Sequence, residues 1–314
     1  MRQLAGSIYY AIADQIYRAR LAGKSGLDAE HKALAWGYRR KPAPHVMTTR
    51  NGVKMHFAEV DYIPLILDYL GCFEPHCLEV ADALISQVQA SEPLILDIGG
   101  NIGAHALQFA QALGPVGTVV TIEAMPNHAA TIARNLALNK GRAMADLHVK
   151  NVAVGAENGR LKLSLPIGGN GGCYTAGLAA EGAEVVEIPM TKIDTIMSTY
   201  EGANVALMKM DVEGSELNAL KGAAETIERH KPHILIEIND VALNSCGTSS
   251  SALKDFFNSQ GYEGFLIDRT KEGKAVIKNI PTDHEHVTDE TLFVHTSKLP
   301  FTIDVLRKAM VCEV

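Results

Sequence analysis

Apolar residues follow two different patterns along this chain. Between residues 4 and 16 an apolar residue recurs every four positions, which is typical of an amphipathic helix. Lys41-Pro42-Ala43-Pro44 interrupts the chain, and Arg50-Asn51-Gly52 predicts a tight hairpin turn. A further helix is expected through Leu78, Leu84 and Val88. Residues 1 to about 90 are therefore expected to be mainly helical.

From Pro93 onward, short continuous apolar runs alternate with helical segments. Such runs indicate strands that are covered on both faces. The predicted strands are 94–98, 118–123, one ending near 154, 205–210, 233–238, 262–267 and 291–295. The predicted helices are 104–113, 127–138, one carrying Leu217, Leu220 and Ile227, and one around 253–257.

This alternation predicts an α/β fold with a doubly wound, mainly parallel sheet. Only loop residues separate the last two predicted strands, so these strands can pair as an antiparallel hairpin. An insertion between Leu161 and Met197 contains the glycine-rich run 168–172. It is expected to form either a mobile loop beside the site or a surface linker.

Composition narrows the class of protein. The 314 residues are 47% hydrophobic and 21% charged, as in ordinary globular proteins. Lys plus Arg number 29 against 36 for Asp plus Glu, a formal net charge of −7. With aromatic residues at only 6%, this balance argues against a nucleic-acid partner.

The sequence gives no indication of a membrane or export segment. No apolar run approaches the ~20 residues that span a bilayer, and the first residues lack the pattern of a secretory signal. The five cysteines never form a CxxC pair, which fits reduced thiols and gives no zinc signature. We therefore expect a cytoplasmic protein without a membrane partner.

The first candidate site element is the segment from Asp97 to Gly103, where a buried strand meets a helix. Open α/β sheets bind ligands at this position, and glycines let the backbone approach them. A dinucleotide loop has the pattern G-x-G-x-x-G, but Asn101 replaces its middle glycine. Asp97 would repel a pyrophosphate and attract a cationic amino group, which favours S-adenosylmethionine over NAD.

The second element is Glu123, at the end of the next predicted strand. A carboxylate there can accept hydrogen bonds from both hydroxyls of a ribose. Because dehydrogenases use the same device, Glu123 alone indicates a nucleoside and no particular cofactor. The alternative is an acidic residue that merely ends a strand.

The third element is the run Met208 to Glu216, in which four ionisable groups surround the end of a central strand. A lysine within an apolar strand must be paired or lose its charge, so Lys209 points to a partner. Lys209 and Asp211 project to the same side of the strand, and Glu237 on the adjacent strand can reach them. The alternative is a structural ion pair followed by a helix start, in which Glu216 lies in the first turn.

These segments together resemble the FkbM family of S-adenosylmethionine-dependent methyltransferases. The matching stretches are LILDIGGNIGAHAL, VVTIEAMPNHAATIARNLALNK, NVAVGAENGRLKL, IPMTKIDTI, LMKMDVEGSELNALKGA and HILIEI, with a weaker echo in TLFVHT. The family usually has phenylalanine where this chain has Ile122, and Gly-Ala where it has Gly99-Gly100.

The resemblance implies a seven-stranded, Rossmann-like methyltransferase sheet in residues 91–314, with residues 1–90 as an N-terminal helical cap on the acceptor side. It implies S-adenosylmethionine as the cofactor. The residues that it assigns to the cofactor are Glu74, Asp97, Gly99, Gly100, Asn101, Ile102, Gly103, Glu123, Ala124, Val152, Ala153 and Asp211.

Methyl transfer to an alcohol requires alignment of the nucleophile and a group that accepts its proton. Asp211 is the first candidate for this base, and Lys209 and Glu237 are expected to tune its charge or position the acceptor. A metal-assisted route is the alternative, in which Mg²⁺ would be held by Asp211, Glu237, Asn239 and Asp240. No ligand spacing requires that ion.

The expected substrate is a hydroxyl of a small natural product or sugar, with N-methylation of an amide or amine as an alternative. Candidate residues for the acceptor pocket are Tyr62, Phe73, His105 and Tyr174. Two alternative functions belong to other classes of protein. One is an NAD-dependent oxidoreductase, whose catalytic residues are not found in the sequence, and the other is a non-catalytic nucleoside-binding module. The sequence does not indicate an oligomeric state.

Overall fold

The computed structural model describes residues 45–57, 63–64, 66–67, 71–164, 185–270, 274–280 and 288–314. The chain divides into two compact units, Met1–Phe73 with Asn170–Gly172 and Glu74–Gly169 with Cys173–Val314. The amphipathic helix expected at 4–16 and the glycine run 168–172 lie outside the described residues.

The first unit contains an antiparallel hairpin of β1 (His45–Thr48) and β2 (Lys54–Phe57). Its turn lies where Arg50-Asn51-Gly52 predicted it, and Gly52 has a φ of +80°. The backbone N–H of Gly52 donates to the carbonyl of Thr49 at 2.9 Å. The turn prediction is thus confirmed, while the two four-residue strands were missed in a region expected to be mainly helical.

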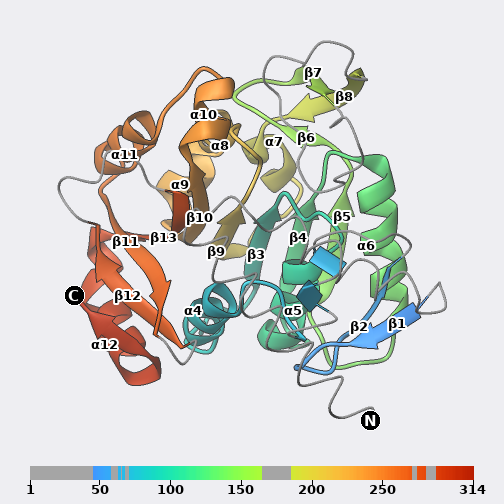
Figure 1. The fold of residues 1–314 in the computed structure, drawn as a ribbon, viewed down its shortest axis with the longest axis horizontal. Coiled ribbons are helices and arrows are strands. Elements are labelled where there is room, and N and C mark those ends of the chain that lie inside the picture. The colour runs from blue at the N-terminus through green and yellow to red at the C-terminus, as the bar shows by residue number, and fades with distance from the viewer. Residues whose placement is uncertain are drawn as a thin grey trace, which may run out of the picture. The chain divides into compact units, whose positions relative to one another are not determined.

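The second unit is built on a nine-stranded sheet in the order β14-β12-β11-β13-β10-β9-β3-β4-β5 (Figure 1). The strands are β3 (Pro93–Ile98), β4 (Thr118–Ile122), β5 (Asp146–Lys150), β9 (Asn204–Met210), β10 (His233–Asn239), β11 (Tyr262–Arg269), β12 (Ala275–Asn279), β13 (Thr288–His295) and β14 (Val311–Glu313). From β5 to β10 all neighbours are parallel, and β13 is antiparallel to both β10 and β11.

The predicted fold class is confirmed, but the sheet has nine strands and not seven. Six predicted strands lie where expected, while the strand expected to end near 154 is β5, which ends at Lys150, and 153–154 form β6 of another sheet. The last two predicted strands pair antiparallel as β11 and β13, but β12 and not only loop residues lies between them in the chain. The two additional strands, β12 and β14, extend the sheet beyond β11. The three residues of β14 are too few to show a strand pattern, and the short apolar run 275–277 in β12 was not recognised as a strand.

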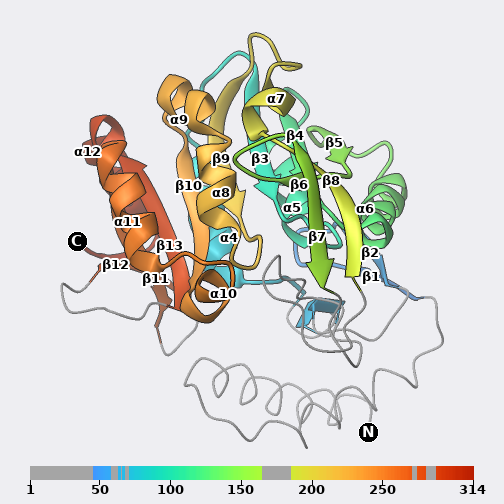
Figure 2. The ribbon, with the colours of Figure 1, turned by 90° about the horizontal axis from the view of Figure 1, so that it is seen from above.

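Helices pack on both sides of this sheet (Figures 1 and 2). They are α4 (Pro75–Ile85), α5 (Ala104–Leu113), α6 (Pro126–Leu138), α7 (Ile193–Met197), α8 (Glu216–Lys221), α9 (Ala224–His230), α10 (Asp240–Ser245), α11 (Ser250–Ser259) and α12 (Leu299–Ala309), with a 3₁₀ turn, η1 (Thr296–Lys298). α4 contacts α5 and α12, and α11 contacts α8. Helices α10 and α12 were not predicted.

The helix expected through Leu217 and Ile227 is divided into α8 and α9 around Gly222. A Cβ atom at Gly222 would lie 2.1 Å from the carbonyl oxygen of Gly155. This close approach of two backbones leaves no room for a side chain at position 222 and marks the join between the helices.

A separate three-stranded sheet, β6-β8-β7, lies beside the main one (Figure 2). It consists of β6 (Ala153–Val154), β7 (Gly159–Ser164) and β8 (Val185–Thr191), and β7 and β8 are antiparallel. The insertion predicted as loop or linker therefore has a strand at each end. The alternation of Leu161 and Leu163 with polar residues was an overlooked strand signal for β7, and Pro189 within β8 argues against a strand there.

The core of the second unit is the central part of the sheet, and β3 is fully buried along its whole length. Leu94, Leu96 and Ile98 have no exposed surface. Because the parallel strands end at one edge, the polar residues at their carboxyl ends meet there. No helix among the described residues has the length and apolarity to cross a membrane.

A stability test follows from Asp194 on α7, whose carboxylate caps the start of α9. It accepts hydrogen bonds from the backbone N–H groups of Glu225 (3.1 Å) and Thr226 (2.9 Å) and from the Thr226 hydroxyl (2.7 Å). Asp194→Ala should lower the free energy of unfolding by about 2 kcal/mol, measured by urea denaturation. Asp304→Ala, which removes an exposed pair with Lys308, should cost less than about 0.5 kcal/mol. Equal losses in the two variants would contradict the capping role.

Candidate functional site

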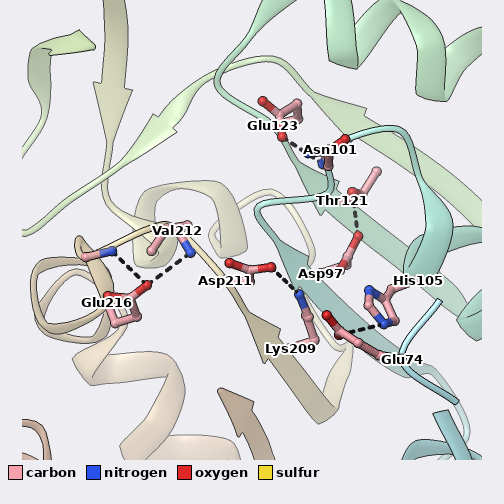
Figure 3. A network of polar contacts seen from close by, with 11 residues as sticks. Glu74, Asp97, Asn101, His105, Thr121, Glu123, Lys209, Asp211, Val212 and Glu216 are labelled. Atoms are coloured by element: carbon pink, nitrogen blue, oxygen red, sulfur yellow. Dashed lines mark hydrogen bonds and ion pairs between the residues drawn. The ribbon is translucent and has the colours of Figure 1, made fainter. Parts of the chain in front are cut away.

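A buried ion pair lies at the carboxyl end of β9. The Lys209 ammonium group is 3.0 Å from Asp211 Oδ2, with side-chain exposures of 2% and 24% (Figure 3). Burial alone would lower the pKa of Lys209, but Asp211 and neighbouring carboxyl groups raise it well above its usual value. The prediction that Lys209 and Asp211 point to the same side of the strand is confirmed.

The glycine loop that follows β3 packs directly against this pair. Gly99 has a φ of +87°, and a Cβ atom there would lie 1.7 Å from the carbonyl oxygen of Asp211. A Cβ atom at Gly100 would lie 2.0 Å from the Thr121 hydroxyl, which donates to Asp97 Oδ2 at 2.9 Å. The second glycine, where the family usually has alanine, is thus required by Thr121 in this chain.

Asp97 presents one unsatisfied oxygen to the loop. Its Oδ1 atom is fully buried and accepts no hydrogen bond from the residues that the structure describes. Burial raises the pKa of Asp97, while Lys209 and the Thr121 hydroxyl lower it. A ligand with an N–H donor, such as the amino group of a methionine moiety, would satisfy this oxygen.

Glu123 links the end of β4 to the same loop. Its Oε2 accepts from the backbone N–H of Asn101 at 2.8 Å (Figure 3). Its Oε1 accepts from the backbone N–H of Met125 at 2.7 Å. Burial raises the pKa of Glu123 to about 7, although both backbone hydrogen bonds lower it. The two predicted cofactor elements, the loop and Glu123, are therefore joined in the structure.

The backbone around the other predicted cofactor residues is also held in place. The Asn151 amide donates to the carbonyls of Glu123 (2.8 Å) and Ala124 (2.9 Å). Val152 and buried Ala153 follow directly and lead into β6. On the loop, Ile102 is buried, and Gly103, with a φ of +86°, begins α5. The Asn151 contacts thus connect the end of β4 to the segment that leads into β6.

Further carboxyl groups gather around Lys209. Glu237 on β10 pairs in register with Glu290 on the antiparallel strand β13. Burial, together with nearby carboxyl groups, raises the pKa of Glu237 to about 9 and that of Glu290 to about 7. Glu290 was missed because only the antiparallel register of β13 brings it to Glu237. The sequence feature that could have indicated Glu290 is its position as a charged residue directly before the apolar run 291–295.

Glu74, at the start of α4, lies against His105 of α5. Glu74 Oε2 is 3.3 Å from His105 Nε2, with exposures of 15% and 6% (Figure 3). Burial raises the pKa of Glu74 well above its usual value and lowers the pKa of His105 well below its usual value. Of the other acceptor-pocket candidates, Tyr62 and Tyr174 lie outside the described residues, and Phe73 belongs to the first unit.

The candidate magnesium ligands have different local partners. Asn239 Oδ1 caps α10 by accepting from the backbone N–H groups of Val241 (3.1 Å) and Ala242 (3.2 Å). Asp240 Oδ1 accepts from Ser250 N–H at 3.3 Å. The side chains of Asn239 and Asp240 therefore stabilise local helix starts. Asp211 and Glu237 belong to the cluster around Lys209.

Glu216 organises the segment that follows Asp211. Its Oε1 accepts from the backbone N–H groups of Val212 (3.2 Å) and Gly214 (3.1 Å). Between them, Glu213 adopts a φ of +52°. Gly214 has no room for a side chain, since a Cβ atom would lie 2.3 Å from the Ala242 carbonyl oxygen. These contacts fit the structural alternative for Glu216.

The chain is similar to known methyltransferases in sequence and to solved methyltransferase structures. The chain is 27% identical over 187 residues to methyltransferase sdnD of Sordaria araneosa, covering 50% of this chain and 68% of that protein. It is 25% identical over 217 residues to the 2-O-methyltransferase NoeI of Sinorhizobium fredii, covering 64% of this chain and 86% of that protein.

Among solved structures, methyltransferase FkbM from Methylobacillus flagellatus matches with a TM-score of 0.42 and 20% identity. The match covers 74% of this chain but only 53% of that one. The O-methyltransferase TomG from Streptomyces achromogenes, solved with S-adenosylmethionine, matches with a TM-score of 0.40 and 16% identity, over 90% and 96% of the two chains.

The family assignment rests on sequence. The profile described as "Methyltransferase FkbM domain" matches residues 97–263, which is just over half of the chain. This span begins at Asp97 and includes the glycine loop, Glu123 and the Lys209–Asp211 pair. The resemblance inferred from the motifs is confirmed, and the chain belongs to the FkbM family of S-adenosylmethionine-dependent methyltransferases.

Proposed function

We propose that this protein transfers a methyl group from S-adenosylmethionine to a hydroxyl of a small natural product or sugar. The observation that carries this proposal is the contact between Asp211 and the glycine loop. A Cβ atom at Gly99 would lie 1.7 Å from the Asp211 carbonyl oxygen, so the candidate base directly adjoins the candidate cofactor loop. A hydroxyl held there would lie within reach of both.

The cofactor, when bound, supplies a methyl group activated by its positive sulfur. Asp97 is proposed to accept a hydrogen bond from its amino group through the buried Oδ1 atom. Glu123 is proposed to accept from the ribose hydroxyls, with Ala124, Val152 and Ala153 beside the adenine. The backbone of Gly99 to Gly103 would then line the methionine part of the cofactor.

Asp211 is proposed to accept the proton that the acceptor hydroxyl loses as its oxygen bonds to the methyl carbon. It is the more exposed member of the ion pair, so it can face both Lys209 and a substrate. Lys209 would orient the Asp211 side chain through their 3.0 Å contact. The pKa of Glu237, about 9 because of burial and Asp211, leaves it protonated at pH 7 and able to donate a hydrogen bond.

Two arguments favour a hydroxyl group as the methyl acceptor. The carboxylate of Asp211 suits an alcohol, which must lose its proton during transfer. The relative NoeI is named as a 2-O-methyltransferase. The same proposal assigns residues 1–90 to the acceptor side. It also takes the acceptor to be a small molecule.

Calorimetric titration of the purified chain with S-adenosylhomocysteine and, separately, with NADH tests the cofactor. Binding of the first alone is expected, and binding of NADH alone would overturn the proposal. A panel of hydroxylated natural products and sugars, with matched amines and amides, then tests the acceptor by release of S-adenosylhomocysteine. Turnover of amines alone would show that the protein methylates nitrogen and not oxygen.

Asp211→Asn tests the proposed base with the acceptor that the panel identifies. We expect kcat to fall at least about 100-fold, because an amide cannot accept the proton. The Kd for S-adenosylhomocysteine should change by less than about threefold, since the loop contacts Asp211 through its backbone carbonyl. Exposed Asp255 provides the control Asp255→Asn, which should leave both values unchanged. Full activity in Asp211→Asn would assign the base to another group.

The pKa of Glu123 predicts a pH-dependent cofactor affinity. Its value of about 7 lies above that of an ordinary glutamate because of burial, and ribose hydroxyls donate to the ionised form. S-adenosylhomocysteine should therefore bind about tenfold more weakly at pH 6 than at pH 8 in calorimetric titrations. Binding should strengthen as the pH rises through 7 and then level off.

Glu123→Gln separates this effect from other titrating groups. The variant should bind more weakly and lose most of the change between pH 6 and 8, because the amide does not titrate. Glu228→Gln, at an exposed position on α9, should keep the full pH dependence. An undiminished pH dependence in Glu123→Gln would show that another group controls binding.

A further inference from the structure

Three side chains beside the proposed methyl-transfer site offer different metal-binding atoms to one point. A carboxylate oxygen of Glu74, the thiol sulfur of Cys77 and an imidazole nitrogen of His105 all lie within 4.8 Å of one another. Cys77 has no exposed surface, and His105 is 5% exposed. Among the described residues, this is the group in which three potential ligand side chains place their ligand atoms this close together.

The fold brings these ligands together from two packed helices. Glu74 precedes α4 and Cys77 lies three residues later in its first turn, so both side chains lie on one face. His105 is the second residue of α5, which packs against α4. Both helix N-termini favour negative charge. Burial and the neighbouring carboxyl groups raise the pKa of the Cys77 thiol, so a bound metal would displace the thiol proton.

The geometry is already close to that of a metal site. Glu74 Oε2 and His105 Nε2 are 3.3 Å apart, the separation of two ligands about 2 Å from a tetrahedral zinc ion. The remaining distances within the group of Glu74, Cys77 and His105 are at most 4.8 Å.

Glu290 can supply a fourth ligand atom, a carboxylate oxygen. Its side chain is 8% exposed and makes hydrogen bonds with the side chains of Glu74 and Cys77. A cation at this point would replace the protons that these groups now share.

We propose that Glu74, Cys77 and His105, with Glu290 as the fourth ligand, form a buried binding site for Zn²⁺. A thiolate, an imidazole and carboxylates together match zinc, whereas Mg²⁺ takes oxygen ligands only. The site is distinct from the magnesium set Asp211, Glu237, Asn239 and Asp240. It assigns Glu74 to a metal and not to the cofactor.

This inference goes beyond the proposed methyl transfer and does not depend on it. The ion would connect the starts of α4 and α5 to β13, next to Lys209. A closed set of four protein ligands, with no position left for water, is typical of a structural zinc site. The expected contribution is therefore to the stability and order of this edge of the sheet.

Cobalt provides a direct probe, because Co²⁺ bound to a thiolate absorbs in the near-ultraviolet. The full chain, freed of metal with a chelator, should bind one Co²⁺ per molecule with this absorption. Equimolar Zn²⁺ should abolish the absorption, and excess Mg²⁺ should leave it unchanged. No near-ultraviolet absorption, or its loss on adding Mg²⁺, would overturn the proposal.

Variants identify the ligands without reference to activity. Cys77→Ser, which is nearly isosteric, should abolish the absorption, while Cys312→Ser on β14 should keep it. Glu74→Gln, His105→Asn and Glu290→Gln should each weaken Co²⁺ binding at least tenfold, with circular dichroism confirming the fold. Absorption that persists in Cys77→Ser, or unchanged affinity in all three other variants, would contradict the site.

Discussion

The buried Lys209–Asp211 ion pair is the interaction on which the rest of the site depends. A lysine with 2% exposure in the middle of an apolar sheet is tolerated only when an acceptor compensates its charge. Asp211 meets this requirement at 3.0 Å, and its backbone carbonyl in turn fixes the glycine loop, where Gly99 leaves no space for a side chain. The need to compensate the charge of Lys209 is therefore linked to the backbone conformation at the carboxyl ends of β9 and β3.

The glycine loop is constrained from its other side by β4. Thr121 fills the space where a side chain at position 100 would lie, and it orients Asp97 through a 2.9 Å hydrogen bond. Glu123 then holds the loop at Asn101 N–H. The loop is thus shaped by contacts with three strands before any ligand binds, and such preorganisation reduces the cost of ordering a site on binding.

Much of this arrangement could be predicted from sequence because it depends on local patterns. Continuous apolar runs located β3, β9 and β10, and the position of Asp97, Glu123 and Asp211 at strand ends followed from parallel connectivity. Glu290 and Cys77 could not be found this way. Glu290 meets Glu237 only through the antiparallel register of β13, and Cys77 meets His105 only through the packing of α4 on α5. Short edge strands such as β14 carry too few residues for any period to appear.

The charge balance around Lys209 also explains which ligands the site can accept. Five carboxyl groups, those of Glu74, Asp97, Asp211, Glu237 and Glu290, face this one lysine. Raised pKa values for Glu237 and Glu290 show that burial already forces protons onto part of the cluster. A pyrophosphate would add negative charge to this surplus, whereas a sulfonium, an ammonium group or a divalent metal ion would offset it. The same electrostatic constraint that makes Lys209 necessary therefore disfavours a dinucleotide and favours positively charged ligands.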